Sequence, residues 1–163
     1  VPTIRIVPFT PDRTEAFARL NEAWIEQFFQ MEDSDRTMLR DPQSYIRDRG
    51  GEIFFALDDE ETVGTVAAAR VSDTAFELAK MAVRPSHQGR GLGRLLAEAA
   101  IAFARARGAT VMFLDTSSRL ATAIALYERL GFRHAAPPVP SRYERADVYM
   151  ELRLDDDPNI GNR

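Results

Sequence analysis

The sequence predicts a mixed α/β fold, with a sheet of about seven strands and helices on both of its faces. Short alternating or continuously apolar stretches, which are typical of strands, occur along the whole chain. Between them lie longer stretches whose apolar residues recur with helical spacing. Glycines and prolines mark the changes between the two patterns. With 163 residues, the chain has the size of one domain and can bury a core.

The expected elements follow the order βααβββαβαββ. In the first half they are a strand over residues 4–8, a helix from Thr10-Pro11 to about Phe29, a short helix holding Met38, Leu39, Tyr45 and Ile46, and a hairpin of residues 53–57 and 63–71. In the second half they are strands over 75–83, 111–114, 132–136 and 145–154, with helices from Leu92 to a cap at Gly108 and from Leu120 to Leu130, before Gly131. Residues 75–83 are nearly all apolar, so this strand is expected to be central. We expect one domain over residues 1–154 and an acidic, disordered tail over 155–163.

Composition and charge argue against several classes of function. The net charge is −4 and the basic residues are scattered, so nucleic-acid binding is not expected. No run approaches the ~20 apolar residues of a membrane helix, and the cytoplasm is the expected compartment. Without cysteine there is no disulfide framework and no thiolate nucleophile or ligand. His87 and His134 lack metal-ligand spacing, so no metal site is expected.

The most informative segment is the glycine-rich turn over residues 83–94, between a buried strand and an amphipathic helix. Its glycines let the backbone approach a ligand closely, because no Cβ stands in the way. The free N–H groups of the first helical turn, and the helix dipole, favour an anion there. Arg90 and Arg94 add positive charge, so a pyrophosphate is the natural occupant. The alternative is a strand-to-helix turn that merely contains convenient glycines.

Two other nucleotide-binding motifs do not fit this turn. A P-loop requires Gly-Lys-Ser/Thr, whereas Arg94-Leu95 follows Gly93 here. A dinucleotide fingerprint requires Gly-x-Gly-x-x-Gly after a first strand, with an acidic residue about 20 positions later. In this chain the glycines are spaced by two and the preceding strand is fourth in order.

Two motifs resemble those of the GNAT superfamily of N-acetyltransferases. Gln88-Gly89-Arg90-Gly91-Leu92-Gly93 is similar to its Gln/Arg-x-x-Gly-x-Gly/Ala pyrophosphate signature. Residues 126–132, Leu-Tyr-Glu-Arg-Leu-Gly-Phe, resemble its second signature at a usual distance downstream. The resemblance spans residues 4–154 and includes the order of elements. It implies an N-acetyltransferase that uses acetyl-CoA as co-substrate, without a metal, and acetylates a primary amine directly in a ternary complex.

The resemblance also implies which residues contact acetyl-CoA. They belong to the end of the central strand, to the glycine-rich turn and to the strand after it: Met81, Ala82, Val83, Gln88, Gly89, Arg90, Gly91, Leu92, Gly93, Arg94 and Thr116. A backbone N–H near residues 81–83 is expected to bind the thioester oxygen where the central strand separates from its neighbour. Leu120 stands where many members carry an asparagine that helps hold the pantetheine arm, and Thr116, Ser117 or Ser118 is expected to replace it.

Acetyl transfer to an ammonium group requires a base, and the departing thiolate benefits from an acid. Glu77 lies on the central strand where many members of this superfamily place the base, and burial would raise its pKa. The alternative is a structural ion pair with an arginine or with Lys80. Tyr127 resembles the superfamily's general acid. The alternative for Tyr127 is a purely structural aromatic on the inner face of its helix.

The acceptor is expected to be a small-molecule amine, either an amino acid or a polyamine-like compound. An acidic cluster of Glu26, Glu32, Asp33 and Asp35 would attract a cationic amine or would form a solvated loop. Arg142, Tyr143 and Arg145 would hold a carboxylate. Three other functions stay open. They are acetylation of peptide or protein N-termini, acyl-CoA binding without turnover, which would need neither Glu77 nor Tyr127, and an unrelated nucleotide-binding module, which would bind ATP or NAD and not acetyl-CoA. The exposed edges of the final strands make a homodimer plausible.

Overall fold

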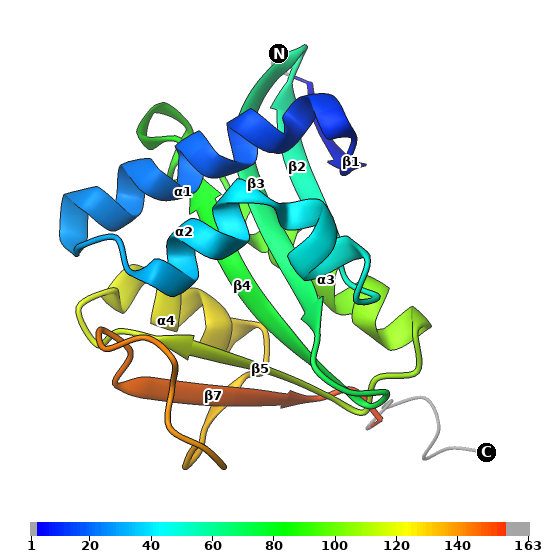
Figure 1. Ribbon diagram of the computed structural model, residues 1–163, viewed down its shortest axis with the longest axis vertical. Helices are drawn as coiled ribbons and strands as arrows, with labels where there is room; N and C mark the ends of the chain where they lie inside the picture. Colours follow the sequence, from blue (N-terminus) through cyan, green and yellow to red (C-terminus); the bar gives the residue numbers. More distant parts are fainter. Residues whose placement is uncertain (1–2, 156–163) are drawn as a thin grey trace.

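The computed structural model describes residues 3–155 and confirms the mixed α/β fold (Figure 1). One sheet of seven strands has the order β1-β2-β3-β4-β5-β7-β6. The strands are β1 (Ile4–Pro8), β2 (Glu52–Asp58), β3 (Glu61–Arg70), β4 (Ala75–Val83), β5 (Val111–Thr116), β6 (Arg133–His134) and β7 (Val148–Arg153). The helices are α1 (Thr14–Phe28), α2 (Asp33–Arg40), α3 (Leu92–Ala106) and α4 (Ala121–Arg129), with short turns η1 (Pro11–Arg13), η2 (Gln43–Arg47) and η3 (Pro85–His87).

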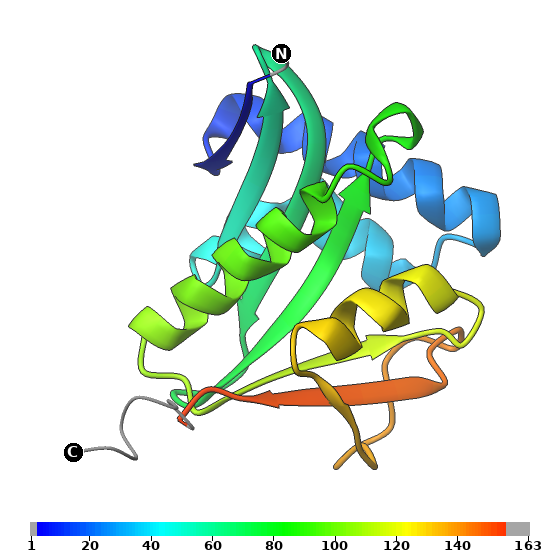
Figure 2. The same cartoon turned by 180° about the vertical axis from the view of Figure 1, so that it is seen from behind.

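The helices cover both faces of the sheet, as the alternating pattern of strands and helices predicts. Helices α1 and α2 lie on one face, whereas α3 and α4 lie on the other (Figures 1 and 2). The apolar stripe of α3 packs on the central strands, with Leu96 and Ala100 fully buried against Phe76 and its neighbours. A second buried cluster under α1 and α2 contains Phe17 and Phe55. The predicted central strand, β4, is therefore covered on both sides.

The two N-terminal helices differ in detail from the prediction. The first begins with a 3-10 turn, and the Thr10 hydroxyl bonds the Asp12 and Arg13 side chains instead of capping the helix backbone. The predicted second helix is two segments, α2 and the π-helical turn η2, with Asp41 and Pro42 between them. Proline lacks an N–H and disfavours helical backbone in the residue before it, so α2 ends there.

The C-terminal strands are shorter than predicted. Strand β7 begins at Val148 instead of residue 145, because residues 143–147 form a turn whose Arg145 side chain reaches back to α2. Strand β6 comprises two residues, Arg133 and His134, instead of five. The predicted tail beyond Asp155 lies outside the described residues, and the domain boundary at residue 154 stays a prediction.

Strands β4 and β5 separate from each other part of the way along. They are the parallel pair of the sheet, and their pairing ends at Glu77 and Phe113. Beyond this point β4 continues to Val83 and β5 to Thr116 along diverging paths (Figure 2). The separation leaves the facing edges of both strands without a strand partner among residues 3–155, and a cavity opens there.

Candidate active site

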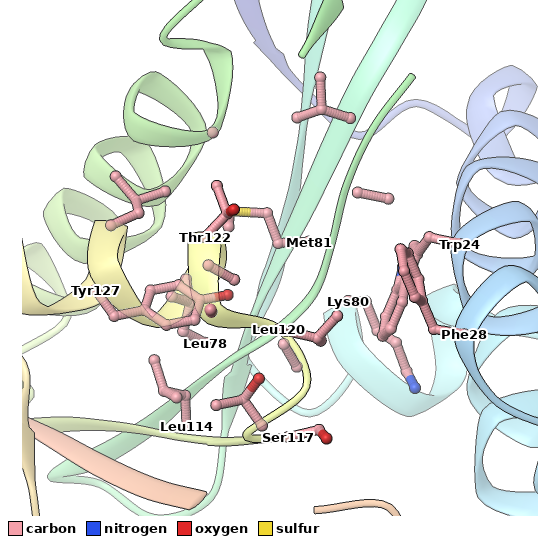
Figure 3. Close-up of a pocket in the computed structure, with 18 of the residues that line it drawn as sticks. Trp24, Phe28, Leu78, Lys80, Met81, Leu114, Ser117, Leu120, Thr122 and Tyr127 are labelled. Atoms are coloured by element: carbon pink, nitrogen blue, oxygen red, sulfur yellow. The ribbon is translucent and has the colours of Figure 1, made fainter. Parts of the chain in front are cut away.

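A cavity of about 700 Å³ occupies the space between the diverging strands. Its walls come from β4 over residues 77–83, the glycine-rich turn, the end of β5, α4, and the loop before β7. Figure 3 shows Tyr127 entering from α4, while Trp24 and Phe28 of α1 close the opposite side. The segments that the sequence predicted to contact acetyl-CoA and those predicted to be catalytic therefore meet in one space.

A β-bulge at Lys80 and Met81 shapes the central wall of this cavity. Ala79 pairs with Ala67 of β3 and Ala82 pairs with Thr65, so β4 carries one extra residue between them. Lys80 adopts a left-handed backbone conformation, with φ of 54°. The bulge inverts the alternation of side chains, because a shift of one residue moves a side chain to the other face. Phe76 and Leu78 face α3, and beyond the bulge Met81 and Val83 do so instead of Lys80 and Ala82.

Buried ion pairs hold the bulge against α2. The Lys80 ammonium donates to Asp35 at 2.5 Å, and the Arg145 guanidinium binds the same carboxylate through two bonds of 2.8 Å. Arg145 also donates to Glu32 at 3.0 Å. Burial raises the pKa of Asp35, but hydrogen bonds from Arg145 and Lys80 outweigh it and hold that pKa well below its usual range. Glu32 and Asp35 are thus neutralised within the fold.

Three of the four members of the acidic cluster are therefore paired within the fold, and Glu26, exposed on α1, is the member without an ion pair among residues 3–155. Glu32 and Asp35 belong to the buried network, and Asp33 pairs with Arg36 on the surface of α2. Arg145, which the sequence offered for a carboxylate, has both of its anionic partners inside the protein. The sequence pattern could not show this, because the partners are 110 and 113 residues apart along the chain.

The glycine-rich turn presents free backbone N–H groups to the cavity. Gly89 and Gly91 have φ of 77° and 81°, a conformation that other residues rarely adopt, and open space lies where a Cβ would stand. Helix α3 has no side-chain cap, so the N–H groups of Leu92, Gly93 and Arg94 have no intrahelical acceptor. Together with the helix dipole, this backbone suits a pyrophosphate.

Side chains around the turn hold its shape. The Gln88 amide donates to the Val83 carbonyl oxygen at 3.0 Å. His87 is buried, and its Nε2 lies 2.8 Å from an Asp58 oxygen at the end of β2. Of the two arginines, Arg94 lines the cavity and pairs with Glu98, whereas Arg90 is exposed and does not line it. His87 thus has a structural partner.

The hydroxyl residues before α4 divide between two environments. Thr116 and Ser117 line the cavity together with Leu120. Ser118 instead binds Asp147, through its backbone N–H at 2.7 Å and its hydroxyl at 2.6 Å. Thr116 and Ser117 therefore remain the candidates for the position of the missing asparagine.

Glu77 lies at the point where β4 and β5 separate, and it lines the cavity. It is 6% exposed, and the Arg142 guanidinium donates to its carboxylate at 3.0 Å. Burial raises the pKa of Glu77 most strongly, Arg142 opposes this effect, and Asp115 on β5 adds to it. The ion pair with an arginine, which was the alternative role for Glu77, is therefore present. The carboxylate also lines the cavity, and its pKa is raised.

Tyr127 reaches the cavity from the inner face of α4. Its ring packs edge-on against Phe132 and points toward Leu78 and Thr122 (Figure 3). Burial raises the pKa of the Tyr127 phenol to about 12, so the group is protonated near neutral pH. Tyr127 therefore belongs to the hydrophobic core and also lines the cavity.

Two residues of the site, Asp115 and Tyr143, lie outside both sequence motifs. Asp115 lines the cavity at the end of β5, and burial raises the pKa of its carboxyl group while Arg142 opposes this. Tyr143 lies in the loop before β7, and its ring is in contact with Lys80, Arg142 and Arg145 at 4.5–5.2 Å. Only the separation of β4 from β5 and the path of this loop bring them to Glu77.

The remaining expectations concern membranes and metals. Within residues 3–155, no helix combines the length and the apolar character needed to cross a bilayer. Over the same residues, no three His, Cys, Asp or Glu side chains are grouped so that they would hold a metal ion.

Comparisons with known proteins agree with this geometry. The model of the acetyltransferase (GNAT) family matches residues 17–132, more than half of the chain. N-acetyltransferase 8B of Rattus norvegicus is 34% identical over 104 residues, which are 61% of this chain and 47% of that protein. N-acetylaspartate synthetase of the same species is 34% identical over 93 residues, 56% of this chain and 31% of that protein. The chain thus matches less than half the length of these relatives.

The fold also occurs among solved structures. An acetyltransferase of the GNAT family from Staphylococcus aureus Mu50 superposes with a TM-score of 0.85. The superposition covers 93% of this chain and 99% of the other at 18% sequence identity. The likeness therefore concerns the fold.

Proposed function

Because this chain belongs to the acetyltransferase (GNAT) family, we propose that it transfers an acetyl group from acetyl-CoA to the primary amine of a small molecule. The observation that carries the proposal is the single cavity that contains the glycine-rich turn, Glu77 and Tyr127. A phosphate-binding backbone, a base and an acid are the three parts that this reaction needs. They come from separate elements, α3, β4 and α4.

The residues that line the cavity fit coenzyme A. The free N–H groups of the turn would bind the pyrophosphate, and Arg94 would add a positive charge. The facing edges of β4 and β5 would flank the pantetheine arm, with Met81, Ala82, Val83 and Thr116 along it. Arg90 would contact the phosphates from the outer side of the turn.

The proposed reaction begins with a proton transfer. An alkylammonium group has a pKa near ~10, so most acceptor molecules must lose a proton before they can attack. Glu77, directly or through water, takes this proton, and the raised pKa of the buried carboxyl group makes it a better base. The free amine then attacks the thioester carbonyl carbon, a C–N bond forms and the oxygen becomes an oxyanion.

Collapse of the tetrahedral intermediate completes the transfer. Backbone N–H groups of β4 near the bulge, which have no strand partner on the β5 side among residues 3–155, would bind the oxyanion. The C–S bond breaks and Tyr127 gives its proton to the departing sulfur. The second proton from the amine nitrogen restores Tyr127, so one proton reaches solvent from Glu77 for each amide and each free thiol produced.

Two observations favour a small acceptor over a protein. The loop before β7 turns over the cavity beside Glu77, and buried ion pairs tie it to α2. N-acetylaspartate synthetase, a relative over about half of this chain, makes a small acetylated product by its name. The two catalytic candidates argue for turnover over acyl-CoA binding alone.

The proposal is tested by calorimetric titration of acetyl-CoA into the protein, with ATP and NAD as controls. Thiol release is then followed with a panel of amino acids, polyamines and peptides. We expect selective micromolar binding of acetyl-CoA and thiol release that depends on a small amine. Binding without thiol release would favour the acyl-CoA-binding module. Thiol release with peptides alone would favour an N-terminal acetyltransferase.

A further inference from the structure

We propose that Arg142 and Tyr143 bind a carboxylate of the acceptor, and that this carboxylate draws Arg142 away from Glu77. The acceptor would then be an α-amino acid or a similar compound with its amine and carboxylate close together. This inference rests on the proposed function, and it narrows the acceptor to one chemical class.

Arg142 lies beside two residues that line the cavity, Glu77 and Tyr143, and the fold satisfies it only in part. Lys80 and Arg145, which contact the same Tyr143 ring, are neutralised by buried Asp35 and by Glu32. Arg142 is 47% exposed and makes one hydrogen bond, from Nη2 to Glu77. A guanidinium group has five N–H donors in a planar fork that matches a carboxylate, so most of its donors remain for a ligand.

Tyr143 supplies a second, independent sign of a ligand. The residue is 8% exposed and lines the cavity. Its hydroxyl group is close enough to the Arg142 guanidinium to raise the pKa of that group, but it has no hydrogen-bond partner of good geometry among residues 3–155. Buried hydroxyl groups normally have a partner, because an unpaired one loses its bonds to water. A ligand carboxylate beside Arg142 would accept from this hydroxyl.

The charges around Glu77 favour a zwitterion over a polyamine. The buried network of Lys80, Arg145, Asp35 and Glu32 is neutral overall. Glu77, Asp115 and Arg142 then carry a net charge of about −1 when the acids are ionised. An ammonium group suits the two carboxylates and a carboxylate suits Arg142, whereas a second ammonium group would meet Arg142 and be repelled.

The geometry also limits the distance between the two groups of the acceptor. Arg142 Nη2 and Glu77 Oε2 are 3.0 Å apart. A carboxylate that takes Arg142 from this contact arrives beside Glu77, so an amine that gives its proton to Glu77 is best placed when it is a near neighbour of the carboxylate in one molecule, as in an α-amino acid. A peptide N-terminus lacks a carboxylate beside its amine.

The exchange of partners would prepare Glu77 for its role. While Arg142 is bound, it stabilises the ionised form of Glu77 and makes the carboxylate a weaker base. When the acceptor carboxylate takes Arg142, this effect is reduced at the moment when the ammonium group is beside Glu77. Binding of the correct acceptor would thus strengthen the base.

The test compares acceptors that differ in the carboxylate alone. Several L-amino acids are each assayed beside their carboxamide and their decarboxylated amine, and kcat/KM is measured by thiol release. The variants are Arg142→Gln, Arg142→Lys and Tyr143→Phe. Arg133→Gln, an exposed arginine on β6 outside the cavity lining, is the matched control. Calorimetry of acetyl-CoA with each variant checks that the fold and the cofactor site are intact.

We expect the wild-type protein to prefer the amino acid over its carboxamide by about 10- to 100-fold, as for hydrogen bonds to charged groups. Arg142→Gln should abolish this preference without lowering kcat/KM for the decarboxylated amine, because Glu77 then loses the cation that weakens it as a base. Arg142→Lys should restore part of the preference, and Tyr143→Phe should reduce it severalfold. Equal turnover of acid and carboxamide by the wild-type protein would overturn the inference and leave the proposed function standing. Equal loss for all acceptors in Arg142→Gln would also overturn it, because Arg142 would then only position Glu77.

A binding measurement separates this inference from the acetyl transfer itself. The same amino acids and carboxamides are titrated into the protein saturated with coenzyme A. Binding of amino acids that is lost in Arg142→Gln, without thiol release from acetyl-CoA, would support the carboxylate site and reject acetyl transfer. No binding of amino acids together with no thiol release would reject both.

Discussion

At the scale of single residues, Glu77 and Tyr127 show how burial changes the acid–base properties of a side chain. Burial raises the pKa of both groups, because it disfavours the charged form of a carboxyl group and of a phenol alike. For Glu77, burial raises the pKa and so makes the carboxylate a stronger base, whereas Arg142 reduces this effect. For Tyr127 the result is a phenol that keeps its proton near neutral pH. One physical effect thus suits each residue to its proposed role.

Glu77→Gln removes the proposed base. A raised pKa means that the carboxyl group is protonated, and inactive as a base, at pH values above the usual range of a glutamate. The wild-type rate should therefore fall as the pH drops through the raised pKa. In Glu77→Gln this decrease in rate at low pH should disappear, and kcat at pH 7 should fall by roughly 100-fold or more. The difference should narrow as the pH approaches the pKa of the amine itself.

The measurement is a pH–rate profile of kcat for the wild-type protein and the variant, with binding of acetyl-CoA measured by calorimetry. Glu60→Gln, which removes an exposed carboxylate on the β2–β3 turn, is the control and should leave the profile unchanged. An unaltered profile in Glu77→Gln would exclude Glu77 from the mechanism.

Tyr127→Phe removes the proposed acid and keeps the ring. General acid catalysis contributes roughly 10²–10⁴-fold, so a loss of kcat in that range is expected under single-turnover conditions. The loss should be nearly constant from pH 6 to 10, since a phenol with a pKa of about 12 stays protonated there. Tyr45→Phe, at a partly exposed site in η2, serves as the control. A loss under threefold, with chemistry rate-limiting, would leave Tyr127 a core aromatic only.

At the scale of elements, the bulge in β4 is the feature that most shapes the site. One extra residue moves Lys80 from the α3 face to the α2 face, where Asp35 holds it. The same carboxylate holds Arg145, so strand β4, helix α2 and the loop before β7 meet at one buried anion. Glu77 and Tyr143 lie on two of these three segments. Asp35 therefore supports the site without taking part in the reaction.

Asp35→Asn leaves Lys80 without its anion and leaves Arg145 with Glu32 alone. Loss of one partner from a buried ion pair costs about 3–5 kcal/mol, so the free energy of unfolding should fall by about that amount in urea titrations. The pKa of Asp35 is lowered in the fold, so its contribution is present above the pKa of the unfolded chain and is lost as the pH falls below it. The difference between the wild-type protein and the variant should accordingly shrink in acid.

Asp33→Asn provides the comparison, because Asp33 pairs with Arg36 at the exposed surface of the same helix. Exposed pairs contribute little, so its effect should stay within about 1 kcal/mol. Equal effects of the two substitutions would contradict the assigned role of Asp35.

At the scale of the whole molecule, the separation of β4 from β5 turns a packed sheet into a binding site. Parallel pairing at one end holds the two strands together, and α3 and α4 cover the same face on either side of the gap (Figure 2). The turn proposed to bind the cofactor and the side chains proposed to be catalytic thus surround one cavity, although they are spread over residues 77–127. No single element contains the site.

Local patterns in the sequence predicted the order of elements, the central strand, the glycine-rich turn and its helix. They did so because periodicity, turn residues and apolar runs act over a few residues. The same patterns overestimated β7 at residues 145–147, where a partner in α2 overrides strand propensity. The π-helical turn after Pro42 was missed because local spacing alone does not show it.

The sequence by itself determined the fold class, the family and the position of the glycine-rich turn, since each depends on residues that are neighbours along the chain. Only the tertiary structure decided which charges are free. Asp35 and Arg145 are bound to each other across 110 residues, whereas Arg142, three positions before Arg145, is half-exposed and bonds Glu77, which lines the cavity. Which charged groups pair, and how deeply they are buried, depends on their distances in space. In this protein the separation of β4 from β5 and the bulge in β4 set those distances.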